Sequence, residues 1–269
     1  MFTTLRLLPL ALLIGSTNVI AQSAWLPVAT GNNFDLRISR GFYGEGGPGL
    51  ATFAMTPSFR IEVAPRLMIE AELPIASASQ SNSFTGDSET GFSPGNPYAG
   101  IVAQVAPVAR LRAGIRPGII SDDLSVGEGL ALGYGVISEY DRFEAYLPDY
   151  TAVRATVELG AVPATGGFAQ ARVGATLFMA SDGGENETLA EYGVRIGMRT
   201  GAVMFHGGML GRAVMTADEG ADKTTNMLTV GIGGAAGRVR PNLEFRYFLD
   251  EDIREEVKGI LALGVTVAL

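Results

Sequence analysis

The last thirteen residues of the chain, Val257-Lys-Gly-Ile-Leu-Ala-Leu-Gly-Val-Thr-Val-Ala-Leu269, alternate between two faces without a break. Every second residue from Val257 onward is apolar or glycine, while Lys258 and Thr266 lie on the other face. Side chains alternate across a β-strand, so the stretch predicts a strand with one apolar face. Such a strand, preceded by the acidic Asp250-Glu251-Asp252, is typical of the closing strand of a membrane β-barrel.

The N-terminal segment has the features of a secretory signal peptide. Arg6 supplies a positive charge, the run from Leu7 to Ile14 is apolar, and Val19-x-Ala21 resembles a cleavage site. We therefore expect residues 1–21 to be a signal peptide and residues 22–269 to form one barrel domain.

The composition restricts how the mature chain crosses a membrane. The chain is 47% hydrophobic, yet no apolar run after the signal approaches the ~18 residues that a spanning helix needs. A membrane protein of this sequence must therefore cross as strands, and a soluble exported β-protein is the alternative. The absence of cysteine excludes disulfides and thiolate metal sites, and the net charge of -8 argues against nucleic acid as a partner.

The same alternation recurs along the whole mature chain. It predicts an all-β fold, an antiparallel transmembrane β-barrel of about twelve strands, and bacterial single-chain barrels have an even number. Short turns alternate with long connectors, as expected for the periplasmic and external ends, and the third long connector covers residues 121–149. The predicted strands are 34–43, 51–63, 67–77, 97–105, 110–120, 150–160, 168–180, 189–199, 202–213, 225–234, 238–248 and 257–269.

Charged residues share one phase within these strands, and their neighbours on the other phase are apolar. A charge on the lipid face costs ~2–4 kcal/mol near the midplane, so these residues are expected to line a polar lumen. Arginine exceeds acid in the set, which favours passive passage of small solutes with a mild preference for anions. The predicted lumen-lining residues are Arg60, Glu62, Glu70, Glu72, Arg112, Arg116, Arg154, Glu158, Arg172, Arg195, Arg240, Glu244 and Arg246.

Arg112 and Arg116 lie four residues apart on one strand face, about 13 Å along the strand, and form a candidate ladder for a carboxylate. Three possibilities stay open: a selective channel, a narrow or nonselective channel, and a closed barrel whose arginines and glutamates neutralise each other. A closed barrel would be structural or adhesive and would act through its external loops.

The third long connector contains a helical stripe. Val136, Tyr140, Phe143 and Leu147 recur at helical spacing, so the connector is expected to be partly helical. It would either fold into the mouth of the barrel as a constriction loop or cap the rim. Four glycines between residues 127 and 135 disfavour a helix, which we therefore expect to begin at about Val136.

His206 is the only histidine in the sequence, so an enzymatic site would be sought there first. The segment Phe205-His206-Gly207-Gly208 has no adjacent serine nucleophile, although a distant partner such as Ser58 stays open. We expect an inward-facing, non-catalytic histidine and no enzyme. Phosphate-binding loops, dinucleotide fingerprints and Cys/His metal spacings are absent, so no cofactor and no metal are expected.

Two motifs connect the chain to a known group. Gly95-Asn96-Pro97-Tyr98 opens a strand after a long connector, and Arg240-Pro241 leads through Phe248-Leu249 to the acidic segment. With these motifs the mature chain resembles Gram-negative outer-membrane β-barrels of small transporter or porin type, including transporters associated with phenol-degradation operons. The resemblance implies the cell outer membrane as location, and outer-membrane lipid, small solutes and the barrel-assembly machinery as partners. The assembly signal of such barrels usually ends in an aromatic residue, whereas this chain ends in Leu269.

Overall fold

The structure, a computed structural model, describes most of the chain after residue 30. The described residues are 31–44, 52–81, 88–121, 123–181, 183–216, 224–234 and 237–269. The expected signal peptide lies outside them, as do residues 22–30, 45–51, 82–87, 122, 182, 217–223 and 235–236.

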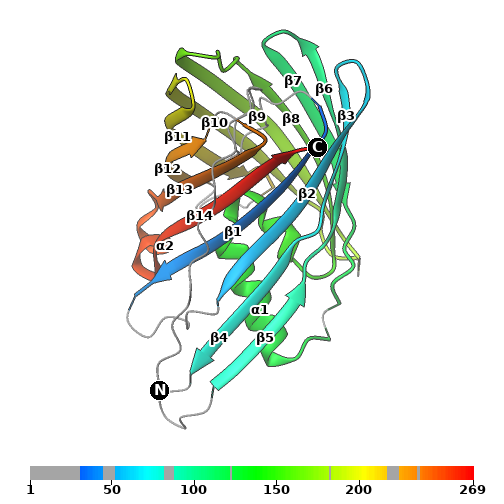
Figure 1. Ribbon diagram of the computed structural model, residues 1–269. Coiled ribbons are helices and arrows are strands. Elements are labelled where there is room, and N and C mark those ends of the chain that lie inside the picture. The colour runs from blue at the N-terminus through cyan, green and yellow to red at the C-terminus, as the bar shows by residue number, and fades with distance from the viewer. Residues whose placement is uncertain are drawn as a thin grey trace.

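The strands form a closed antiparallel barrel (Figure 1). β1 (Asn33–Tyr43) pairs on one side with β14 (Val257–Ala268) and on the other with β2 (Phe53–Ala64), which closes the ring. The ring has twelve strands, as the sequence predicts. The others are β3 (Leu67–Glu72), β6 (Tyr98–Ala106), β7 (Ala109–Arg116), β8 (Tyr150–Leu159), β9 (Gly166–Ala180), β10 (Glu187–Thr200), β11 (Val203–Val214), β12 (Thr224–Gly234) and β13 (Val239–Phe248).

Alternation along the strands separates a charged interior from an apolar exterior. In β2, Arg60 is 2% exposed, whereas its neighbours Phe59 and Ile61 are 43% and 52% exposed. In β7, Arg112 is buried and Leu111 is exposed. Strands closed into a ring satisfy every ladder hydrogen bond internally, and an apolar outer surface is what a lipid bilayer requires.

The two ends of the ring differ. Asn33 pairs with Ala268, and the N–H of Leu269 donates to the carbonyl of Asn32 at 3.0 Å, so the first and last strands of the ring begin and end together. The short turn at residues 64–66 lies at this same end, named here the turn end (Figure 1). The opposite end, named the loop end, carries the long connectors.

The second long connector is largely a β-hairpin. β4 (Ile75–Ser81) and β5 (Ser88–Pro94) pair with each other beyond the ring at the loop end (Figure 1). Pro74 lies between β3 and β4, and the segment Gly95 to Pro97 separates β5 from β6; proline lacks the N–H that a strand ladder uses. The strand predicted over residues 67–77 is therefore divided into β3 and the start of β4, and much of the long connector predicted over residues 78–96 is paired strand.

The third long connector contains α1 (Val126–Ser138) and a 3-10 helix, Tyr140–Tyr146. The expected helix start at about Val136 is wrong, because Ser125 begins the helix with a capping box. The N–H of Glu128 donates to Ser125 Oγ at 3.3 Å, and the N–H of Ser125 donates to Glu128 Oε2 at 2.9 Å.

Packing against the β4–β5 hairpin explains why the glycine-rich segment 127–135 is helical. Glycine lowers helix stability by about 1 kcal/mol per residue relative to alanine. Here it allows the helix to touch the hairpin, since a Cβ on Gly91 of β5 would lie 1.6 Å from the carbonyl oxygen of Gly127. Buried Ala131 and Leu132 of α1 then share a core with Ala76 of β4.

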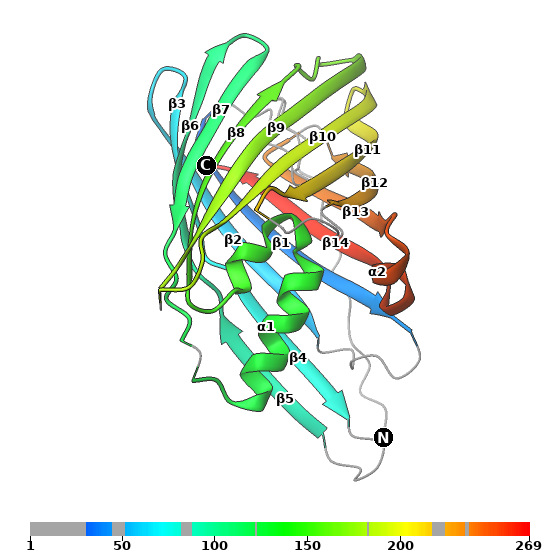
Figure 2. The same ribbon diagram turned by 180° about the vertical axis from the view of Figure 1, so that it is seen from behind.

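Residues 123–148, named here the insert, lie on the inner side of β4 and β5 and reach into the barrel from the loop end (Figure 2). The connector between β13 and β14 holds a short helix, α2 (Glu251–Glu256). Among the described residues, no helix has the length and apolar character to cross a membrane.

Candidate functional site

The structure buries all but one of the charged residues that the sequence places in the lumen. Arg154 of β8 reaches Glu191 of β10 across β9, at 2.6 Å between Nη2 and Oε2, which requires both side chains to lie inside the ring. Glu62 is exposed toward the turn end and lines no interior. The buried members are Arg60, Glu70, Glu72, Arg112, Arg116, Arg154, Glu158, Arg172, Arg195, Arg240, Glu244 and Arg246.

One wall of the lumen carries a continuous chain of ion pairs between β2, β3 and β7. Arg60 Nε lies 3.2 Å from Glu70 Oε2, and Arg112 pairs with the other oxygen of the same carboxylate. Glu72 accepts from Arg112 Nη2 at 2.8 Å and from Arg116 Nη2 at 2.7 Å. These five residues, named the wall ladder, already engage the two arginines that the sequence suggested as a ladder for a carboxylate solute.

Tyr98 of β6 supports the wall ladder from behind. Its ring packs against Gly100 and Gly114, where an added Cβ would lie 2.4 and 2.3 Å from the Tyr98 hydroxyl oxygen. The guanidinium carbons of Arg112 and Arg116 stand 5.0 and 5.3 Å from the ring centroid. This cation–π contact holds both arginines at the height of the glutamates of β3.

The acids of the insert bind arginines of β1 and β13. Arg37 of β1 pairs with Glu139, and its Nη2 lies 3.1 Å from Asp141 Oδ2. Arg246 of β13 places Nη1 2.6 Å from Asp141 Oδ1, while its Nε donates to Glu244 at 2.7 Å. All five side chains are buried.

Two further arginines hold the insert from β8 and β11. Arg154 Nη1 lies 3.2 Å from Glu144 Oε1. Arg212 donates to the carbonyls of Tyr140 and Asp141 at 2.6 and 2.7 Å, and its guanidinium lies 4.6 Å from the Phe143 ring centroid. Because β1, β8, β11 and β13 lie on different sides of the ring, the insert spans the lumen. Its anchors, a name kept below, are Arg37, Arg154, Arg212 and Arg246.

Asn96 joins the insert to the wall. The side chain accepts from the N–H groups of Ile119 and Ile120 at 2.8 and 3.1 Å and donates to the carbonyl of Leu147 at 2.7 Å. Its backbone carbonyl accepts from Arg116 Nη1 at 2.6 Å. This fully buried residue gives the Gly95-Asn96-Pro97-Tyr98 motif a structural role at the base of the insert.

The helical stripe of the insert packs against apolar side chains of the strands, and the acidic residues between the stripe residues face the anchors. The α-helix ends at Ser138 and Glu139 is its C-cap, so the stripe continues into the 3-10 helix with a changed direction. Tyr140 packs edge-on against Phe248 at 5.0 Å, and Phe143 stacks on Phe178 at 5.6 Å, both between ring centroids. Leu147 packs in the same apolar cluster as Phe143, and Val136 packs in the cluster that α1 forms with β4.

The lumen holds more buried arginines than buried carboxylates. Among the described residues, twelve arginines and nine carboxylates are buried, an excess of three positive charges.

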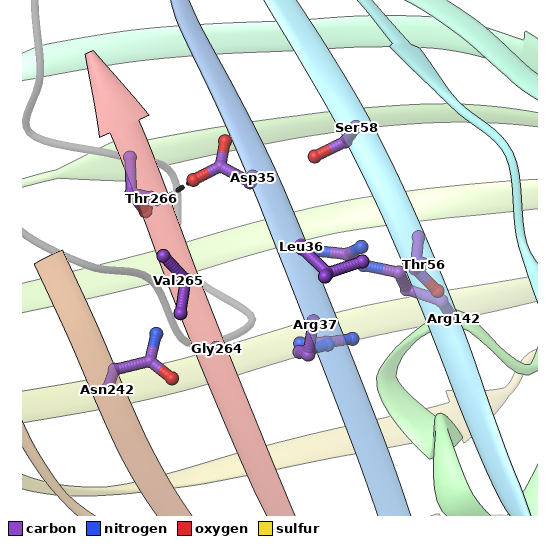
Figure 3. A pocket seen from close by; sticks show the side chains of 10 residues that line it. All are labelled: Asp35, Leu36, Arg37, Thr56, Ser58, Arg142, Asn242, Gly264, Val265 and Thr266. Carbon is purple, nitrogen blue, oxygen red and sulfur yellow. Dashed lines mark hydrogen bonds between the residues drawn. The ribbon is translucent and has the colours of Figure 1, made fainter. Parts of the chain in front are cut away.

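A cavity of about 20 Å³ lies between Asp35, Arg37, Arg142 and Asn242 (Figure 3). A second, of about 10 Å³, lies beside Arg172 and Arg212. A water molecule needs roughly 10–15 Å³, so each has the size of one water.

His206 lies on the inner face of β11 and is 8% exposed. Its pairing neighbours are Gly197 and Gly231, whereas Ser58 lies on β2 in register with Asp35. The structure therefore does not bring the two together as a nucleophile and base. Within the described part of the chain, no group of three or more His, Asp or Glu residues is arranged to hold a metal.

The acids of the insert are the site residues that sequence reasoning missed. Glu139, Asp141 and Glu144 occupy the polar side of the stripe, which usually faces water in a surface helix. The available signal was the excess of arginine in the strands, since unpaired cations inside a barrel require carboxylates from another segment.

No family model and no curated protein matches the sequence. Solved structures match the fold. The COG4313 outer membrane channel from Pseudomonas putida F1 aligns with a TM-score of 0.57 at 10% identity, over 89% of this chain and 96% of that chain. LpxR from Salmonella typhimurium gives 0.53 at 12% identity, and the NanC porin gives 0.52 at 8%, each over 88% of this chain and 100% of its own.

At these identities the likeness concerns the fold alone. The closed ring, its apolar exterior and its charged interior, together with these neighbours, define an outer-membrane β-barrel. The protein is therefore located in the outer membrane.

Proposed function

We propose that the protein is an outer-membrane channel for passive passage of small solutes, with a mild preference for anions, and that the insert narrows it. The excess of buried arginine over buried carboxylate carries this proposal. In a confined passage of low dielectric, such an excess lowers the barrier for an anion more than for a cation. The fold shared with the NanC porin and the COG4313 channel supports a channel.

The insert is attached in a way that permits movement. Its two ends meet at one point of the rim, because the N–H of Asp149 donates to the carbonyl of Ile120 at 3.1 Å. The insert is thus a side branch of the ring, and its displacement would break ion pairs and apolar contacts but no hydrogen bond of the strand ladder.

A closed barrel that acts through its external surface is the second candidate. The observation that favours it is the filling of the lumen by the insert, with four anchors on different strands. In this case neither the wild type nor a variant without the insert would conduct.

Reversal potentials of the refolded protein in planar bilayers, under a KCl gradient, test the channel proposal. We expect a modest potential of the sign that chloride preference produces. A potential of cation sign would reject the anion preference, and a folded protein that never conducts, with or without the insert, would reject the channel.

We also propose that the loop end faces outside and that the barrel has no enzymatic activity. An added Cβ at Gly129 of the insert meets no atom within 4 Å, so a cysteine there is accessible. An impermeant label should reach Gly129→Cys on intact cells and should not reach Pro163→Cys in a short turn. The reverse pattern would invert the orientation.

A further inference from the structure

The cavity of about 20 Å³ lies between the insert and the wall formed by β13, β14, β1 and β2 (Figure 3). Arg142 is the one residue of the insert that lines it, and it is also the only basic residue of the insert. The 3-10 helix is interrupted at this residue, which has φ −142° and ψ 31°. Arg37 of β1 lines the same cavity from the ring. Two guanidinium groups, one from the insert and one from the ring, therefore border a single space.

The ion pairs of Arg142 are long. Its Nη1 lies 3.5 Å from Glu72 Oε1, and its Nε lies 3.8 Å from Asp141 Oδ2. Glu72 has a closer partner in Arg116, at 2.7 Å. Asp141 has a closer partner in Arg246, at 2.6 Å. Arg142 is only 7% exposed, so its charge is largely removed from water, and it keeps N–H donors for a further acceptor.

Arg37 contributes a second donor to the cavity. Its Nε donates to Glu139 at 3.0 Å, and its Nη2 lies 3.1 Å from Asp141. Its buried Nη1 has no hydrogen-bond partner among the described residues, although the residue is only 5% exposed. An unsatisfied buried donor is costly, so this atom indicates an acceptor in the cavity.

The lining includes one acid, Asp35, which is already engaged. Its Oδ2 lies 2.9 Å from Arg60 Nη1, and its Oδ1 accepts from Thr266 Oγ1. The charged residues of the lining are thus two arginines and one aspartate that has an arginine of its own. This arrangement favours an anion over a cation. It also favours an anion over a water molecule, because a neutral molecule would leave the charge of Arg142 without a close counter-ion.

The size of the cavity selects the kind of anion. One water molecule needs roughly 10–15 Å³ of such volume, and this cavity offers about 20 Å³. Chloride is only slightly larger than water, whereas sulfate and carboxylates have several heavy atoms. The cavity therefore fits a monatomic anion and excludes oxyanions while the insert is in place.

We propose that Arg37 and Arg142 form a binding site for a monatomic anion such as chloride, at the boundary between the ring and the insert. Ser58 of β2, which is 4% exposed and lines the same cavity, supplies a hydroxyl group. The inference rests on the proposed anion channel and deepens it. The contact with the anion moves from Arg112 and Arg116, which the wall ladder engages, to the one arginine that the insert carries.

Broadening of the chloride NMR line measures the binding. The full chain, refolded in detergent, is titrated with sodium chloride, and sodium gluconate keeps the ionic strength constant. We expect excess broadening that saturates, because bound chloride relaxes faster than free chloride. Sodium sulfate at the same ionic strength should not displace the chloride, since sulfate is too large for the cavity.

Variants connect the signal to the cavity. Arg142→Gln removes the charge of the insert and should weaken chloride binding at least about tenfold. Ser58→Val keeps every charge but replaces the hydroxyl with two methyl groups, which fill the cavity, and should abolish binding. Arg199→Gln is the matched control, because Arg199 of β10 is 3% exposed and does not line the cavity. It should bind chloride as wild type does.

The site is rejected if no saturable broadening appears, if sulfate displaces the chloride, or if Arg142→Gln and Ser58→Val, both heat-modifiable on gels like wild type, still bind as wild type does. Equal losses in Arg142→Gln and Arg199→Gln would also reject it, since they would show a general effect of lumenal charge. Conductance of the same preparation is recorded in parallel. Chloride binding by a non-conducting barrel would reject the channel and keep the site, and anion-selective conduction without chloride binding would do the reverse.

Discussion

The wall of β2, β3 and β7 and the wall of β8, β11, β13 and β1 both hold buried arginines, but with partners of different origin. In the wall ladder, Arg112 and Arg116 pair with Glu70 and Glu72, which belong to a neighbouring part of the same ring. The anchors bind the insert, which is not part of the ring, and two of them, Arg154 and Arg246, also keep a carboxylate of the ring, Glu191 and Glu244. The same chemistry therefore stabilises the barrel on one side and holds a removable segment on the other.

Breaking the wall ladder should have the largest effect on stability. Arg112→Gln with Arg116→Gln leaves the carboxylates of Glu70 and Glu72 buried with fewer partners, and loss of a buried pair costs roughly 3–5 kcal/mol. We expect the heat-modified gel band to convert at a lower temperature and the unfolding midpoint in urea to fall. Arg238→Gln, at an exposed arginine, is the control. Equal stability of the double variant and the control would refute the role of the ladder.

Breaking the anchors should loosen the insert and leave the ring folded. Glu139→Gln with Asp141→Asn removes the carboxylates that Arg37 and Arg246 bind, and hydrogen bonds to charged groups contribute roughly 1.5–3 kcal/mol each. Amide hydrogen exchange in α1 should accelerate at least about tenfold. Exchange in the ring strands serves as the internal control. Unchanged protection of the α1 amides, or an equal loss of protection in the insert and in the ring strands, would show that these ion pairs do not hold the insert separately from the ring.

A smaller effect is expected at the start of the insert. Ser125→Ala removes the cap of α1, which is worth about 1 kcal/mol, and should speed exchange in the first helical turn only. Hydrogen bonds from Ser125 lower the pKa of Glu128. The hydrogen bonds that Glu128 accepts are therefore present at neutral pH and are lost as the pH falls through that lowered pKa. In Ser125→Ala only the hydrogen bond from the backbone N–H remains, so this acid dependence of exchange should become smaller; an undiminished acid dependence would show that other groups cause it.

The smallest effect is expected at His206. Since no nucleophile accompanies it, His206→Ala should leave assembly intact, and neither wild type nor variant should cleave ester or phospholipid substrates. Hydrolysis by the purified wild type that the substitution abolishes would establish an enzyme and overturn our proposal.

The sequence predicts the ring well because period-two alternation is a local property. The phase of Arg60 against Phe59 and Ile61 alone assigns the inner and outer faces of β2. The hairpin of β4 and β5 is harder to predict, because Pro74 interrupts the strand that pairs with β2, although β4 resumes that pairing as far as Ser77.

The partners of the lumenal arginines could not be predicted in the same way. Glu139 lies 102 residues from Arg37, and no local period connects them. The early start of α1 depends on contact between Gly127 and Gly91 of the hairpin, so a helix propensity read along the chain gives the wrong boundary. Local pattern therefore identifies the wall, and tertiary contact determines what fills it.

Single-channel conductance with and without the insert shows whether the insert narrows a channel. Because Ile120 and Asp149 are hydrogen-bonded, a short Gly-Ser turn between Ser121 and Asp149 can replace the insert without opening the ring. We expect this variant, still heat-modifiable, to conduct several times more than wild type and to retain anion preference. Equal conductance of the two proteins, or no conductance from either, would contradict it.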